Sequence, residues 1–578
     1  MQTDLAAQTA RVAFTGDLSP RVLDLVSARV GTDVRRFYDF DALRAEHAEA
    51  RFGPGWKFEH LAARVHIPRM NSYGVVMEDG RATVELTPTR FWSPDAFARI
   101  GDNFARGTYE HDLRTHDYRF LLAGRLRPLA ISAWFKDWWP NFFRQLDFTE
   151  APPDASVEVA GSWREGRRSR VFVFADAGAS VIRGTPLDRV RTRLFIRPSF
   201  FDGLELRAER GEGTLRGRFT HTTDPLTQEW RVLDLEFDST LGLDVAAQFL
   251  GPAVAQPLAA FQLAAPPTLR VSGRFPGPAA PPGTNDLLRI TAETRGAFAF
   301  HRFPLSDVSF KATLEGDSLV VDDFYGRLAG GTATGHARVW GRGTDRRVGF
   351  DVALEDASFG GAVGTLQTFF AAQRNEPPPA PGKFVQERAA VRLDLAASAQ
   401  GRYDDPFSFK GDGNASLRGA EIGEVPLLGL LSELLKFTSL RFTDARANFK
   451  IDQRRLVFPK VELRGSNSAI DANGEVHLER RELAFNAKIY PFGESDGLLK
   501  SVVGAVLTPL SSVFEVKLAG TLEKPSWSFA NNPINLFRSG PSPGTDPVAP
   551  AGLPPPATAP LAPTPGLLPP PASPPAQP

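Results

Sequence analysis

Strict alternation of apolar and polar side chains is the feature that most constrains this chain. In the stretch FTDARANFKID, the apolar residues Ala445, Ala447, Phe449 and Ile451 are separated by single polar residues. Successive side chains of a β-strand point to opposite faces, so this pattern predicts a strand with one dry and one wet face. AIDANGEVHLE and FEVKLAGTL alternate in the same way. The chain is therefore expected to be mainly β.

The alternating segments recur in a fixed order. A lead-in strand such as FPLSDVSFKATL precedes DSLVV and a glycine-rich strand, and a later strand closes the unit near a glycine. The closing glycines are at positions 53, 161, 273, 401 and 520, roughly 110–130 residues apart. Self-similarity at a long period predicts an array of stacked units. The first residues, TARVAFTGDLSPRVLDLV, resemble the middle of a unit, so we expect the chain to be part of a longer one.

Composition excludes several classes of function. The 578 residues are too many for one compact core. Lys+Arg and Asp+Glu both number 67, and this balance argues against nucleic acid as a partner, because nucleic-acid binding needs a basic surface. The chain has no cysteine, which removes disulfides and thiolate chemistry and suits an oxidising compartment. It shows neither a secretory signal nor a membrane-spanning apolar run.

Three segments differ from the strands in pattern. Leucines at helical spacing predict a helix over 424–437, and 497–513 is apolar with Pro509 as its expected end or kink. The segment 131–148 is the most aromatic of the chain, and it predicts a helix that either lies at a membrane interface or braces the sheet. Residues 539–578 are rich in Pro and Ala and predict a disordered tail.

No motif predicts catalysis, a metal or a cofactor. His111 and His116 have odd spacing, which predicts opposite faces of a strand, and His60 and His66 lack the glutamate of a zincin motif. The glycines of RGEGTLRG do not complete a dinucleotide-binding motif, and neither a nucleophile elbow nor a phosphate-binding loop is present. We expect a protein that is not an enzyme.

The C-terminal third resembles a known family. VPLLGLLSELL, FTDARANFKID, AIDANGEVHL, ELAFNAKIYP and VFEVKLAGTLEKPSWSFANNP follow one another in an order similar to the C-terminal region of AsmA-like proteins, a set that includes TamB-like relatives. The resemblance is best over about 410–533, and GTLEKP followed by Trp527 is its most specific piece. Residues 1–409 match in style, as an array that lacks its N-terminal part.

The resemblance implies an elongated, repeating β-groove. Such a groove is a curled, antiparallel-rich sheet with short amphipathic helices between repeats, here followed by the disordered tail. The expected parts are groove repeats over 1–409, the AsmA-like region over 410–538 and the tail over 539–578. The family implies a periplasmic protein of a Gram-negative-type bacterium, anchored in the inner membrane through a segment absent from this chain, which carries phospholipid acyl chains towards the outer membrane.

The inward-facing positions of the alternating strands are the expected groove lining, and many of them are small enough to leave room for a guest. The predicted lining residues are Val157, Val159, Leu204, Leu206, Leu319, Val321, Phe449, Ile451, Ile470, Val476, Leu478, Phe485, Phe514, Val516 and Leu518. The predicted membrane-contact residues are Trp134, Trp138, Trp139, Phe142, Leu430, Leu434, Leu499 and Val503. Phospholipid, a membrane and envelope proteins are the expected partners.

Other interpretations of the same pattern remain open. An elongated β-sandwich array would alternate in the same way, with the apolar faces filled by the protein itself. A scaffold for outer-membrane proteins would use unpaired sheet edges to bind client strands. A carbohydrate-binding or carbohydrate-cleaving β-protein would need a pair of carboxylates facing a cleft.

Overall fold

The computed structural model describes most of residues 1–529. Its two long gaps are 423–441 and 491–513, and shorter ones fall within 31–37, 136–138, 149, 374–388, 421, 467, 481 and 522–524. The chain divides into the units Met1–Ala530 and Asn531–Pro578, and the described residues belong to the first unit. The expected helices 424–437 and 497–513 and the expected tail lie outside the described residues.

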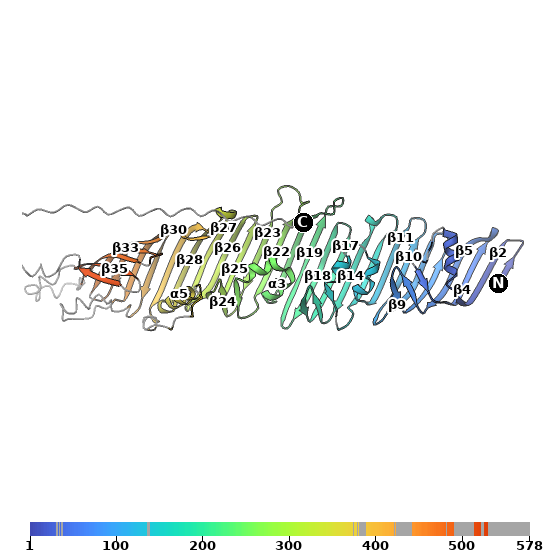
Figure 1. Ribbon diagram of the computed structural model, residues 1–578, viewed down its shortest axis with the longest axis horizontal. Helices are drawn as coiled ribbons and strands as arrows, with labels where there is room; N and C mark the ends of the chain where they lie inside the picture. The colour runs from blue at the N-terminus through green and yellow to red at the C-terminus, as the bar shows by residue number, and fades with distance from the viewer. Residues whose placement is uncertain are drawn as a thin grey trace, which may run out of the picture. The chain divides into compact units, whose positions relative to one another are not determined.

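One antiparallel sheet contains thirty of the strands that the structure describes, which confirms the mainly β prediction. Pairing begins with β1 (Gln2–Asp4) against β2 (Thr9–Leu18) and ends with β35 (Phe514–Thr521) against β36 (Pro525–Phe529). Figure 1 shows the strands side by side, from β2 to β35. Within the described ranges β1 and β36 do not pair with each other, so the sheet is open.

Between these ends the strands fall into four groups of six. The first is β4 (Leu43–Gly53), β5 (Lys57–Ile67), β8 (Asp79–Leu86), β9 (Arg90–Ile100), β10 (Asn103–Asp112) and β11 (Asp117–Arg125). The second is β13 (Asp154–Ser162), β14 (Arg170–Ala177), β17 (Arg189–Arg197), β18 (Phe200–Arg210), β19 (Gly213–Thr223) and β20 (Trp230–Ser239).

The other two groups complete the main ladder. The third is β22 (Thr268–Pro276), β23 (Leu287–Glu293), β25 (Phe303–Glu315), β26 (Ser318–Leu328), β27 (Gly331–Trp340) and β28 (Arg347–Ser358). The fourth is β29 (Arg392–Arg402), β30 (Asp405–Arg418), β31 (Asp444–Asp452), β32 (Arg455–Arg464), β33 (Ala469–His477) and β34 (Glu482–Tyr490).

The described α-helices follow either β2 or the last strand of a group. They are α1 (Val22–Val30) after β2, α2 (Trp139–Phe143) after β11, α3 (Leu243–Leu250) and α4 (Pro252–Leu258) after β20, and α5 (Phe359–Gln373) after β28. Because antiparallel strands alternate in direction, these insertions all leave the sheet at the same end of the strands. We call this side of the sheet the helical edge (α3 and α5 in Figure 1). The opposite edge, the turn edge, is made of short connections such as 113–116, 163–169, 341–346 and 403–404.

Small strands at the helical edge hold the insertions. β3 (Tyr38–Phe40) pairs with β6 (Met70–Ser72), which pairs with β7 (Val75–Met77). β12 (Leu146–Asp147), β15 (Ser180–Ile182) and β16 (Thr185–Leu187) repeat this arrangement, and β21 (Phe261–Leu263) on β24 (Ala297–Phe300) does so beside β25. Met77 and Leu187, which close the first two, are both buried, so much of the enclosed core sits at this edge.

The face of the main sheet that carries the apolar positions of the alternating strands is called the inward face here, and the opposite, polar face is the outward face. The outward face carries cross-strand ion pairs. Arg274 and Asp234 are paired at 2.7 Å and Arg270 and Asp238 at 2.8 Å, and each pair lies directly opposite in register. These side chains are mostly exposed, so each pair contributes little to the free energy of unfolding. Their value lies in register, because a slip by one residue would separate every pair.

We predict that Asp176 contributes an acid-sensitive part of the stability. Arg189 and Arg191 contact it at 2.8 and 2.7 Å and lower the pKa of its carboxyl to about 2. Because the folded-state pKa is depressed, this stabilisation is present above pH about 4 and is lost as the pH falls towards 2. Melting temperatures of wild type and Asp176→Asn should therefore differ near neutral pH and converge on acidification. A difference that does not change with pH would contradict the assignment.

Candidate functional site

The inward face of the sheet is the feature that extends furthest along the molecule. Cross-strand register connects one residue from each of 25 consecutive strands into a single row, from β5 to β36. We call it the apolar row. Its members are Ile67, Gly80, Ala98, Ala105, Gly124, Ala155, Ala175, Thr192, Leu206, Gly217, Phe237, Val271, Ile290, Ala312, Val321, Ala337, Phe350, Ala399, Gly411, Ile451, Leu456, Val476, Leu483, Gly520 and Pro525.

None of these row members is charged, and Thr192 is the one polar residue among them. Its hydroxyl donates a hydrogen bond to the carbonyl oxygen of Glu205 at 3.2 Å, so the polar group is satisfied within the sheet. Rows on either side have the same character, such as the pairs Leu463 with Ile470 and Ile470 with Ile489. The central rows of the inward face therefore form a continuous apolar surface, whereas His111 and His221 lie on the same face nearer the turn edge.

This surface is not enclosed. Among the row members whose side chains the structure describes, Gly80, Ala312 and Ala399 are buried, Gly520 is exposed and the others are half-buried. A sandwich would bury such central positions completely, because a second sheet would pack against them. The half-burial therefore disfavours the sandwich interpretation over these residues.

Glycines on the inward face are partly covered by phenylalanine rings. A Cβ atom built on Gly203 would lie 2.4 Å from Cε1 of Phe219, and one on Gly413 would lie 2.4 Å from Cζ of Phe449. The rings thus lie across the glycines of the neighbouring strand, as aromatic residues do when they compensate for missing side chains. The expectation that small residues simply leave room for a guest is wrong at these positions, because the protein's own rings occupy the space.

The predicted lining residues fall into three classes. Leu206, Val321, Ile451 and Val476 are members of the apolar row. On neighbouring rows of the same face, by strand periodicity, are Val157, Val159, Leu319, Phe449, Ile470, Phe485, Phe514, Val516 and Leu518. Of these, Ile470 and Val516 are buried, and the side chain of Phe514 lies outside the description.

The two remaining lining residues lie elsewhere. Leu204 is 46% exposed and is the extra residue of a bulge, because Gly203 and Leu206 are the positions that continue the pairing with β19. Leu478 follows the end of β33, in a turn where its N–H donates to the carbonyl oxygen of Arg454 at 2.8 Å. Simple alternation could not reveal either displacement, since a bulge and a strand end both break the two-residue period.

The aromatic segment packs against the sheet. The ring centroids of Phe142 in α2 and Phe201 in β18 are 6.5 Å apart, and Phe201 in turn contacts Phe219 of the inward face. Trp139 contacts Phe135 and Phe143, whereas Trp134 is 42% exposed and donates its indole N–H to the carbonyl oxygen of Ser72. These contacts support the bracing alternative for Phe142. Trp138, Leu430, Leu434, Leu499 and Val503 lie outside the described residues.

The two histidines of HDLRTH are neighbours, so the prediction that they lie on opposite faces is wrong. The chain turns between His111 and His116, and their ring centroids are 5.9 Å apart. Burial and the nearby His116 lower the pKa of His111, whose Nε2 has no hydrogen-bond partner among the described atoms. Over the described ranges, no cluster of three histidine or carboxylate side chains is suited to a metal ion.

No helix within the described part of the chain combines the length and the apolar character needed to cross a membrane. No family model and no curated protein matches the sequence.

We predict that Gly217→Ala destabilises the sheet. A Cβ atom here would lie 2.2 Å from the carbonyl oxygen of Glu236 and 2.3 Å from Cδ1 of Phe237, so the backbone must move. A loss of about 1–3 kcal/mol is expected, as for other overpacked sites. The control Gly178→Ala, which has open space around it, should change stability by less than about 0.5 kcal/mol. Urea unfolding measures both, and equal midpoints would contradict the close packing.

We also predict that the apolar row is accessible in the folded protein. The chain lacks cysteine, so Ala337→Cys introduces a single thiol at a half-buried row position. It should react with a small maleimide without denaturant, whereas Ala357→Cys, at a fully buried position, should not. Equal protection of the two thiols would mean that the inward face is closed by other parts of the chain.

Proposed function

We propose that this protein is a non-enzymatic carrier of phospholipid acyl chains, which lie along the apolar row of an open β-groove. The observation that carries the proposal is the row itself, 25 strands long and without a charged member. An enzyme would concentrate polar groups at one place, whereas this surface repeats one chemistry along its length. The resemblance of 410–533 to AsmA-like proteins supports the same function.

The energetics suit a carrier. Each methylene group that leaves water contributes about 0.8 kcal/mol, so a chain of about sixteen carbons gains on the order of 12 kcal/mol. Because the row offers similar apolar contact at each strand, this gain changes little as the lipid moves from one strand to the next. Movement along the row then needs no energy source at the site itself.

The groove form of the surface is part of the proposal. Paired strands twist, and we propose that this long single-layered sheet of twisted strands also curls into a trough. The contact of Phe142 with Phe201 supports an insertion that lies over the inward side rather than over the ion-paired outward face. We propose that the insertions at the helical edge form one wall of this trough.

The alternatives from the sequence are less well supported. A scaffold that binds client strands needs strands with unpaired backbone groups along its length. Each described main-ladder strand from β2 to β35, however, pairs with a neighbour on both sides. A carbohydrate-cleaving site needs two carboxylates across a cleft. The row members have none.

A place in the bacterial envelope is part of the same proposal. A surface that shields acyl chains is useful where lipid must cross an aqueous compartment between two membranes. The absence of cysteine suits an oxidising periplasm. The resemblance implies that the array of strands extends from the inner membrane towards the outer membrane.

We predict that a charge on the inward face blocks lipid carriage. Leu518→Asp and Val476→Asp place a carboxylate against the passing acyl chain, at a cost of several kcal/mol. The rate at which the purified protein transfers a fluorescent phospholipid between vesicles should fall by about tenfold or more, since about 1.4 kcal/mol already accounts for a factor of ten.

Lys517→Asp is the matched control, because Lys517 is exposed and precedes Leu518 on the opposite face of β35. It should leave the transfer rate unchanged. Native mass spectrometry of wild type should also find co-purified phospholipid, released on unfolding. A lipid-free wild-type protein, or equal damage from Lys517→Asp, would overturn the carrier proposal.

A further inference from the structure

One place on the turn edge has a chemistry unlike the rest of the inward face. It lies where the first group of strands meets the second, at the turn 113–116 and the loop 163–169. Along β13 the inward positions run from Val157 and Val159 to Gly161, and Trp163 and Arg164 follow beyond the strand. The surface thus passes from aliphatic to aromatic to cationic over a few residues. Amphipathic surfaces show this order at the boundary between hydrocarbon and phosphate.

The aromatic part of this place is well ordered by contacts. The rings of Tyr118 and Trp163 are 4.2 Å apart between centroids, and those of Tyr109 and Phe120 are 4.3 Å apart. The N–H of Trp163 donates to the carbonyl oxygen of His116 at 3.0 Å, which ties the loop to the neighbouring turn. Trp163 nevertheless remains 59% exposed.

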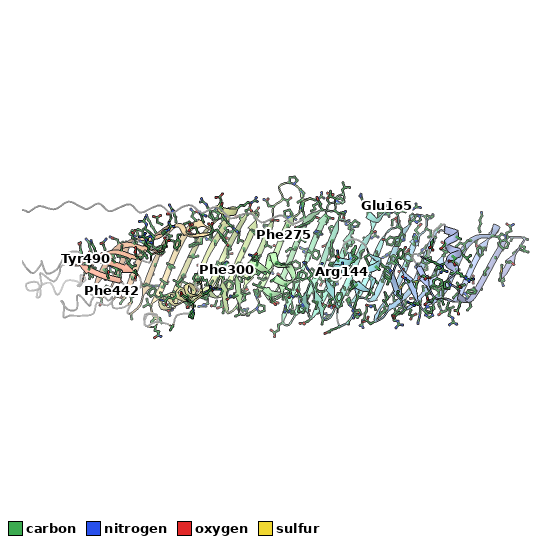
Figure 2. All side chains as sticks on the ribbon, in the orientation of Figure 1. Arg144, Glu165, Phe275, Phe300, Phe442 and Tyr490 are labelled. Atoms are coloured by element: carbon green, nitrogen blue, oxygen red, sulfur yellow. The ribbon has the colours of Figure 1, made fainter. Side chains whose placement is uncertain are left out.

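The loop 163–169, which we call the arginine loop, has three arginines and one acidic residue. Figure 2 labels that acidic residue, Glu165, at the upper margin of the sheet. Arg168 lies 3.1 Å from Asp117 and 4.0 Å from Glu165 and is thereby neutralised. Among the described residues, Arg164 and Arg167 have no ion-pair partner, and both are exposed. The loop therefore presents two uncompensated guanidinium groups beside the aromatic cluster.

The arrangement recurs further along the turn edge. Between the third and fourth groups, the N–H of Tyr403 donates to the carbonyl oxygen of Arg346 at 2.9 Å, and the guanidinium of Arg346 lies 4.7 Å from the ring of Tyr403. Trp163 and Tyr403 both stand two residues after a closing glycine, Gly161 or Gly401. An aromatic residue beside arginine at the same position of two groups indicates a feature of the surface rather than an accident of one loop.

We propose that the arginine loop, with Trp163 and the turn 113–116, binds a phosphate-bearing anion. Guanidinium groups form paired hydrogen bonds with phosphate oxygens, and an exposed indole suits the boundary with an apolar chain. The anion is either a lipid headgroup, whose acyl chains would lie along the apolar row, or free phosphate. The headgroup source rests on the proposed function, and the binding of phosphate itself does not.

The test compares wild type with the double variant Arg164→Gln, Arg167→Gln. The control double variant, Arg64→Gln, Arg99→Gln, removes the same charge from exposed outward-facing arginines for which the described residues provide no ion pair. Calorimetric titrations use a short-chain phosphatidylglycerol below its micelle concentration, inorganic phosphate, and a short-chain diacylglycerol that has no phosphate. The arginine-loop variant should bind phosphatidylglycerol at least about tenfold more weakly than the control variant does.

Each result has a distinct meaning. Weaker phosphatidylglycerol binding with unchanged diacylglycerol binding supports a headgroup site. Inorganic phosphate binding that is lost in the arginine-loop variant, without binding of either lipid, supports a phosphate site and overturns the carrier proposal. Phosphatidylglycerol and phosphate titrations that are the same for the two double variants overturn the arginine loop as a site, whatever diacylglycerol does.

Discussion

Cross-strand register is the constraint on which the rest of the structure depends. Side chains alternate with a period of two, so a slip of one residue between any two strands would bring charged side chains onto the apolar face. The sheet keeps its faces through irregularities as well. At the bulge in β18, the two residues between Gly203 and Leu206 oppose the single residue Arg218 on β19, and Gly203 and Leu206 both remain on the inward side. A shift of register would break each outward ion pair and each apolar pair on the inward side, so these pairs stabilise the observed register.

Alternation alone predicts much of this arrangement, because it reports directly which face a residue occupies. It assigns Val157, Phe449 and Val476 to the face on which the register places them, since their strands are regular where they occur. It failed at Leu204, where an extra residue changes the period, and at His111 and His116, where a turn separates two residues assumed to share a strand. The arginine loop escaped notice because its meaning comes from proximity to the turn of another hairpin, which only the fold creates.

A single-layered sheet distributes its stability unusually. Most strands pack against their two neighbours and little else, so stabilisation is local and additive along the array, as in other repeat proteins. Phenylalanine rings over Gly203 and Gly413 increase the buried apolar area without closing the surface. The small sheets at the helical edge, with Met77 and Leu187 buried, supply enclosed packing that the open face lacks. The enclosed core therefore lies at the helical edge, and the central rows of the inward face remain uncovered.

The groups of six strands have a consequence for how such a chain can change in length. Six is an even number, so every group begins with the same strand direction, and the insertion after its last strand always emerges at the helical edge. Adding or deleting one whole group would leave every other strand with its faces and edges unchanged. At about 4.8 Å between strands, each group extends the surface by about 29 Å. The molecule is thus built on a module whose number sets the distance that the surface spans, and gene duplication could adjust that distance without changing the surface itself.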